Sequence, residues 1–163
     1  PQATSAVVVD GSAAEWASTP ALNGGAGGTV TALKARNDGT NLYVLAQGSG
    51  LNVKSQFFLN TDNNLATGFN PAGWAASGLD TLLENQNLFA YSGANNSWQW
   101  TYATALSAAQ FVRNDTVIEL AIPLSSLGLT AGGGTIRIGF IANDSATNRL
   151  PASGGAPFAY TLQ

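Results

Sequence analysis

The stretch FFLNTDNNLATGFNPAGWAASGLDTLLE, residues 57–84, contains two short apolar runs joined by a long polar loop. The first run, 57–59, turns abruptly into the Asn- and Asp-rich segment 60–64, and the second run follows Asp80. Short apolar runs bounded by turn residues are typical of buried β-strands. A long loop held between two strands is usually functional or disordered, and the many oxygen-bearing side chains of this loop favour a function.

Short β-strands separated by turn residues are also expected on both sides of this loop. Alternating residues at 29–36 and 42–47 flank the turn Asn-Asp-Gly-Thr, which predicts a β-hairpin. A second hairpin is predicted from the runs 109–113 and 116–122, which flank Asn-Asp. The other predicted strands lie at 87–91, 97–103, 135–142 and 157–162. This spacing, without any long helical periodicity, predicts an all-β fold, a single-domain antiparallel β-sandwich of many short strands over residues 1–163.

The composition favours a neutral ligand. The chain has 163 residues, enough for one domain with a buried core. Only 9% of them are charged, against about a quarter in an ordinary domain. The net charge of −3 is spread without basic clusters, so neither nucleic acid nor an anionic membrane surface is an expected partner. A neutral, hydroxyl-rich ligand suits this balance better.

Cysteine, histidine and methionine are missing from the chain. Without histidine and cysteine, catalytic triads are excluded and the commonest transition-metal ligands are lost. No apolar stretch is long enough to cross a membrane. Ala, Gly, Ser, Thr and Asn dominate, as in many secreted bacterial modules, and the Pro-Gln-Ala start suggests a processed chain. We therefore expect a secreted, extracellular protein.

Four motifs, in this order along the chain, resemble those of a known family. They are VDG at 9–11 followed by Trp16, NDGTNLYV at 37–44, NTDNNLATG at 60–68 followed by GLD, and VIELAIPL at 117–124. Together they resemble the family 9-like carbohydrate-binding modules and the wider fold family that includes DOMON domains. The resemblance implies a β-sandwich that binds a polysaccharide without cleaving it, in a larger chain with an attached catalytic domain. It also implies that Trp16 is a core residue.

Oxygen-bearing side chains at both ends of the long loop are candidate ligands for calcium. Asp62, Asn64 and Asp80 would meet if the loop ends converge, and calcium accepts about six to eight oxygen ligands in flexible loops. Asn60 stands where many relatives have an aspartate, which removes one negative charge from such a site. The alternative is that Asp62 and Asn64 close Asx-turns by hydrogen bonding to their own backbone.

Tryptophans are the candidate sugar-binding platforms, because the C–H face of a sugar ring stacks on a flat aromatic surface. Trp74 lies among small loop residues that could not bury it locally, so we expect it to be exposed and to bind the ligand. Trp98, Trp100 and Tyr102 share one face of a predicted strand. We expect Trp100 and Tyr102 in the sandwich core, whereas Trp98, beside a turn, fits either the core or a platform. The side chains expected to hydrogen-bond the sugar hydroxyls are Asn95, Asn96 and Gln99.

Three functions follow as alternatives. The first is a non-catalytic module that binds a neutral polysaccharide and is attached to a secreted glycan-active enzyme. The second is a structural or adhesive spacer domain of a secreted protein, without a sugar site. The third is a small glycan-active enzyme, for which Glu84 and Glu119 are candidate carboxylates, since glycoside hydrolysis needs two such groups.

Overall fold

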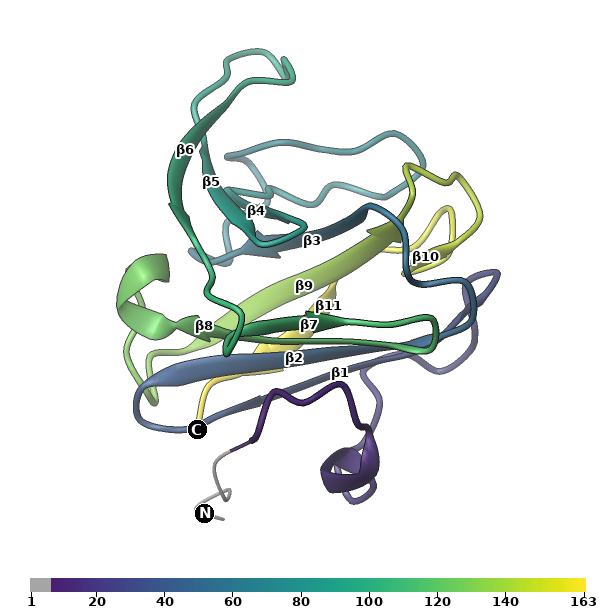
Figure 1. The fold of residues 1–163 in the computed structure, drawn as a ribbon. Helices are drawn as coiled ribbons and strands as arrows, with labels where there is room; N and C mark the ends of the chain where they lie inside the picture. The colour runs from purple at the N-terminus through teal and green to yellow at the C-terminus, as the bar shows by residue number, and fades with distance from the viewer. Residues whose placement is uncertain (1–6) are drawn as a thin grey trace.

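The computed structural model describes residues 7–163 and confirms the predicted all-β antiparallel sandwich (Figure 1). Two sheets face each other, and the smaller sheet has the strand order β1-β2-β8-β7. Its strands are β1 (Val30–Asn37), β2 (Asn41–Gly48), β7 (Phe111–Arg113) and β8 (Val117–Pro123). Both predicted hairpins are therefore present, as the antiparallel pairs β1–β2 and β7–β8.

The larger sheet runs in the order β10-β9-β3-β4-β5-β6, with β11 pairing with β9 beside β10. Its strands are β3 (Ser55–Asn60), β4 (Thr81–Glu84), β5 (Asn87–Tyr91), β6 (Trp100–Ala105), β9 (Thr135–Ala142), β10 (Arg149–Leu150) and β11 (Phe158–Thr161). A short 3-10 helix, η2 (Leu124–Leu127), lies between β8 and β9. Figure 1 shows β5 and β6 rising steeply from the plane of β3 and β9, so the outer face of this sheet is concave.

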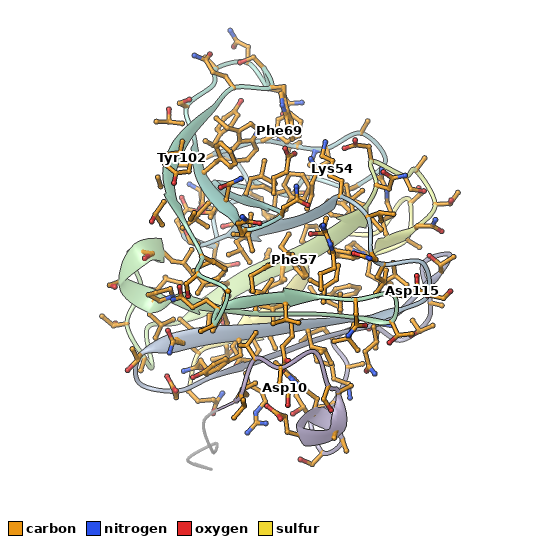
Figure 2. The ribbon with its side chains drawn as sticks, viewed as in Figure 1. Asp10, Lys54, Phe57, Phe69, Tyr102 and Asp115 are labelled. Atoms are coloured by element: carbon orange, nitrogen blue, oxygen red, sulfur yellow. The ribbon has the colours of Figure 1, made fainter. Side chains whose placement is uncertain are left out.

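The main core lies between the two sheets. Strand alternation directs Phe57 and Leu59 of β3 inward, and the ring of Phe57 lies 4.6 Å from that of Phe140 on β9. Val44 of β2 and Leu120 of β8 belong to the same buried cluster on the opposite sheet. Figure 2 shows Phe57 between the layers. Each aliphatic side chain buried in this way contributes about 1.5–3 kcal/mol, so this interior holds the two sheets together.

The N-terminal segment covers the outer face of the smaller sheet. Its short 3-10 helix, η1 (Ala14–Trp16), buries Trp16 completely, which confirms the core position predicted for that residue. The indole N–H of Trp16 donates a hydrogen bond of 2.6 Å to the buried Glu119 carboxylate of β8. The backbone N–H groups of Asp10 and Gly11 donate to the same carboxylate at 3.0 Å each. Burial raises the pKa of Glu119, and these three hydrogen bonds only partly offset that rise.

Candidate functional site

The outer face of the larger sheet carries an apolar patch at its centre. Every residue of β3 is buried, on both faces of the sheet. On the outer face, Phe58 points away from the main core and packs with Leu82 of β4 and Ile141 of β9. Contact between these apolar side chains and water is unfavourable, so a covering segment stabilises the fold. The long loop between β3 and β4 covers part of this patch with Trp74 and Leu79. The part that the loop leaves open is the candidate site.

Trp74 is buried under this loop, so the prediction that it forms an exposed platform is wrong. Its side chain is 8% exposed, and its indole N–H donates a hydrogen bond of 2.8 Å to the Pro151 carbonyl. The ring lies against Gly139 of β9, where an added Cβ would come within 2.5 Å of an indole carbon. The guanidinium of Arg149 lies 5.7 Å from the ring centroid. A glycine on the outward face of a central strand thus makes the space that buries this tryptophan.

Trp98 is the exposed tryptophan of this region. Its side chain is 55% exposed, although it contacts three other rings at their edges. The ring centroids of Phe69, Trp100 and Phe58 lie 5.1, 5.5 and 6.3 Å away. Edge-to-face contacts of this kind fix a ring in place. Trp98 therefore does not belong to the core, and its exposed ring is held from beneath by these contacts.

Trp100 and Tyr102 lie outside the main core, so the prediction that both belong to it is wrong. Trp100 is half-buried in the outer aromatic cluster, 5.1 Å from the ring of Tyr91. Tyr102 is 58% exposed and contacts Phe89 at 5.9 Å. Both side chains belong to β6, the edge strand that rises from the sandwich, as Figure 2 shows for Tyr102. The aromatic stripe predicted from the alternation is real, but it lies on the outer face.

The hairpin that carries Trp98 is tied to the long loop by one side chain. The Asn96 side-chain oxygen accepts a hydrogen bond of 2.7 Å from the Asn70 N–H, and its amide donates one of 3.1 Å to the Asn70 carbonyl. Asn96, predicted to bind sugar, is therefore already occupied within the protein. Asn95 is exposed beside it, and Gln99 is exposed in the wall of the groove described next.

Two adjoining hollows form a groove across the outer face, here called the outer groove. The larger, of about 450 Å³, lies over β10, β9, β3 and β4, and the smaller, of about 350 Å³, lies over β4, β5 and β6. Both volumes fall within the range of about 300–1,000 Å³ that is usual for ligand sites. Glu84 and Trp98 line both hollows. The polar residues that line the groove are Lys54, Gln56, Glu84, Gln99, Asp144 and Arg149.

A charged network fixes the polar side of the outer groove. The Lys54 ammonium lies 3.3 Å from a Glu84 oxygen and 3.0 Å from Asp144. Gln56 donates a hydrogen bond of 2.8 Å to the same Glu84 oxygen. The hydrogen bond to Asp144 raises the pKa of Lys54, and Glu84 adds to that rise, so the lysine is charged at neutral pH. Figure 2 places Lys54 and Phe69 on the same side of the larger sheet.

Arg149 joins three segments at the other end of the larger hollow. Its Nε and Nη2 groups donate hydrogen bonds of 2.9 and 2.7 Å to the Ser145 carbonyl, and Nη1 donates one of 3.0 Å to Ala72. Burial lowers the pKa of Arg149, but an arginine keeps its charge in proteins. Two cations and two carboxylates therefore line the groove, and their formal charges cancel.

The two ends of the long loop lie side by side. Asp80 accepts hydrogen bonds from the backbone N–H groups of Thr61 and Asp62, at 2.9 and 3.3 Å. Asp62 accepts one of 2.8 Å from the Asn64 N–H, and Asn64 accepts one from the N–H two residues further on. These last two bonds form the Asx-turns that were the alternative to a metal site.

Asp62 and Asn60 keep acceptor capacity that a hard cation could use. Each carboxylate oxygen of Asp62 accepts one hydrogen bond and keeps a second lone pair, whereas each oxygen of Asp80 already accepts two hydrogen bonds. The buried Oδ1 of Asn60 has no hydrogen-bond partner in the described part of the chain. Between residues 7 and 163, no three acidic side chains cluster as a metal site. A cation here would thus be held by few charges, so calcium remains a prediction for the long loop.

The candidate catalytic carboxylates lie in different places. Glu119 is sealed beneath the N-terminal segment on the smaller sheet, whereas Glu84 faces the outer groove on the larger sheet. Glycoside hydrolysis requires two carboxylates flanking one bond. Glu84 and Glu119 therefore do not form such a pair.

Sequence reasoning missed several residues of the outer groove. Lys54 and Asp144 come together from distant parts of the chain, and Arg149 begins a two-residue strand that the sequence did not predict. One available signal was Gln56, a polar residue inside the otherwise apolar run of β3.

No family model matches the chain, and no curated protein matches it. Among the residues that the structure places, no helix has the length and apolar character to cross a membrane.

Proposed function

We propose that this domain is a non-catalytic carbohydrate-binding module that holds a neutral polysaccharide in the outer groove. The observation that carries the proposal is the position of Trp98, a half-exposed indole that lines both hollows of the groove. An indole held by the edges of Phe69 and Trp100 loses little freedom when a ligand stacks on it. Stacking of a ring on an aromatic side chain is worth about 1–3 kcal/mol in nucleic-acid complexes, and a sugar face offers a comparable surface.

The polar residues beside Trp98 suit sugar hydroxyls. Gln56, Glu84 and Gln99 supply amide and carboxylate groups along the groove. A ligand site of this type combines apolar walls with a few polar groups that fix orientation. Because Lys54 and Arg149 balance the two carboxylates, the groove does not favour a charged glycan over a neutral one.

The wider context is proposed on the resemblance of the sequence motifs. In it, the domain belongs to a secreted protein and is attached to a glycan-active enzyme. Binding to the polysaccharide would keep that enzyme near its substrate and raise the effective concentration without new chemistry. Calcium in the long loop would stiffen the segment that carries Phe69, one of the rings that hold Trp98.

A glycan panel with intrinsic tryptophan fluorescence tests the proposal. The isolated domain is screened against soluble neutral and acidic polysaccharides, with and without EDTA. We expect at least one neutral glycan to change the fluorescence, and Trp98→Ala to weaken its binding about tenfold or more, since about 1.4 kcal/mol is tenfold. Leu65→Ala, which removes an exposed apolar side chain that lines neither hollow, is the matched control and should bind normally. If the domain binds no glycan, the proposal fails and the alternative function, a spacer domain without a sugar site, is supported.

A further inference from the structure

We infer that Gln56 and Glu84 form a pair of hydrogen-bond acceptors in the larger hollow of the outer groove, and that this pair selects glycans with two neighbouring, unsubstituted hydroxyl groups. This inference rests on the proposed function and specifies the chemical feature of the ligand that is recognised. The hydrogen bonds of the two side chains carry it.

Gln56 and Glu84 lie directly opposite each other on the neighbouring strands β3 and β4. Gln56 is only 4% exposed, and both residues line the larger hollow. The Gln56 Nε2 group donates a hydrogen bond of 2.8 Å to Glu84 Oε2. Since only the nitrogen of an amide can donate to a carboxylate, this bond fixes the orientation of the amide. The amide and the carboxylate are therefore held side by side in a defined arrangement.

Each of the two groups has one oxygen without a protein donor. Within residues 7–163, neither Gln56 Oε1 nor Glu84 Oε1 accepts a hydrogen bond. Unlike the unpaired Asn60 Oδ1, Gln56 Oε1 is not sealed from solvent, and its residue lines the hollow. Amide and carboxylate oxygens accept hydrogen bonds and cannot donate them. The pair therefore presents two acceptors to a ligand.

The neighbouring cation adds no donor to this pair. The Lys54 ammonium lies 3.0 Å from each oxygen of Asp144 and 3.3 Å from Glu84 Oε2, so carboxylate oxygens take up its three N–H groups. A ligand group placed against the pair must bring its own donors. Two neighbouring hydroxyls of a sugar meet this requirement, whereas their esters and ethers do not. A site built to hydrogen-bond a hydroxyl rejects an analogue that lacks it, because the acceptor is then left unpaired.

Glu84→Gln tests the pair with little change of shape. The Gln56 amide and the Lys54 ammonium both need an acceptor at this position, so the new amide must turn its oxygen toward them. Its NH₂ group then takes the place of Glu84 Oε1. A donor thus faces the ligand where an acceptor stood.

The experiment is isothermal titration calorimetry of the intact domain with dextran, soluble starch, xylan and glucomannan. Each polysaccharide is used deacetylated and after partial chemical O-acetylation, which converts hydroxyl donors into esters. The variants are Glu84→Gln and Gln56→Met, and thermal unfolding shows that each is folded. Asp115→Asn, in an exposed turn outside both hollows, makes the same change of charge as Glu84→Gln and is the control.

We expect acetylation of at least one polysaccharide to weaken its binding to the wild type about tenfold or more. Glu84→Gln should weaken binding of the deacetylated form to a similar extent, and Gln56→Met about threefold or more, whereas Asp115→Asn should bind normally. Acetylation should then cost Glu84→Gln less affinity than it costs the wild type, because both changes remove the same hydrogen bonds.

A Glu84→Gln variant that binds like the wild type overturns the inference and leaves the proposed function standing. An equal loss on acetylation in the wild type and in Glu84→Gln does the same, because the ester then acts only by its bulk. If Glu84→Gln does not fold, unchanged binding by Gln56→Met has that meaning. If none of the four polysaccharides binds, the inference fails, and the proposed function fails with it unless another neutral glycan of the panel binds.

Discussion

The side-chain amide of Asn96 is hydrogen-bonded to both the N–H and the carbonyl of Asn70. This pair of bonds joins the β5–β6 hairpin, which carries Trp98, to the loop between β3 and β4, which carries Phe69. The two rings lie 5.1 Å apart. The position of the exposed indole therefore depends on a contact between two loops that are far apart in the sequence.

Removal of this contact should loosen the loop without unfolding the domain. Asn96 has a φ of 60°, so Asn96→Gly deletes the side chain without backbone strain. Two hydrogen bonds at an exposed position should contribute about 0.5–1.5 kcal/mol each. We expect a small loss of stability but faster amide exchange at Asn70. Asn95→Gly is the control, because Asn95 has a similar φ of 53° and its side chain is exposed. Equal exchange at Asn70 in the two variants would contradict the prediction.

Trp74 should behave as a core residue. Trp74→Ala should lower the free energy of unfolding by about 3–5 kcal/mol, the usual cost of truncating a buried tryptophan. Gly139→Ala should also destabilise, because its Cβ would overlap the indole. In the double variant the two losses should fall short of additive, since the Cβ then enters the space left by the indole. Urea unfolding of the four proteins measures this cycle, and strict additivity would show that the two residues do not compete for space.

The hairpins and the core were predictable because their signals are local. The turn between β1 and β2 is closed by its own residues, with Asp38 accepting hydrogen bonds from Thr40 and Asn41. The burial of Trp74 was not predictable in this way, because the space for it is made by Gly139, 65 positions further along. Alternation correctly put Tyr102 on a face with Trp98 and Trp100 but could not tell which face of which sheet.

The outer groove was predictable only in part, for the same reason. Trp98 and Gln99 lie next to a recognisable turn, and both residues line the outer groove. The Lys54, Glu84 and Asp144 network joins three segments, and nothing local to any one of them indicates the other two.

Replacement of Glu119 should destabilise the attachment of the N-terminal segment. Glutamine offers one acceptor oxygen where the glutamate offers two, so Glu119→Gln leaves at least one of the donors Trp16, Asp10 and Gly11 without its acceptor. The expected loss is about 1–3 kcal/mol. Asp115→Asn, in an exposed turn, is the control and should unfold like the wild type.

The effect of Glu119 should also depend on pH. Burial raises its pKa above the ordinary 4.5, so the native state binds the proton more tightly than the unfolded chain does. This contribution to stability is fully present below pH 4.5 and is lost as the pH rises through the folded-state pKa. The difference in unfolding free energy between wild type and Glu119→Gln should therefore be larger at about pH 4 than at about pH 7. If the difference in unfolding free energy instead grows with pH, the pKa of Glu119 is not raised in the folded state.

Calcium should raise the melting temperature if it binds the long loop of the native state only. EDTA should lower it, and Asp62→Ala should abolish the shift between the two conditions. The quantity compared is the difference in melting temperature between calcium and EDTA. The melting temperature itself is not compared, because Asp62→Ala also removes the turn hydrogen bond from Asn64. Asp115→Ala removes a carboxylate from another turn and should keep the shift. A melting temperature that responds to neither calcium nor EDTA would leave Asp62 and Asn64 with Asx-turn roles alone.

Within residues 7–163, no strand pairs with the outer edge of β6, and this has a consequence at high protein concentration. An unpaired edge strand is a template for pairing with another chain, and many proteins guard such edges with lysine or proline. Residues 100–105, WTYATA, contain neither, and they are mostly β-branched or aromatic and without charge. Such a composition is the one most prone to aggregate through strand addition. The edge strand beside the groove is thus also where self-association should begin, and Thr101→Lys or Thr104→Lys should suppress it.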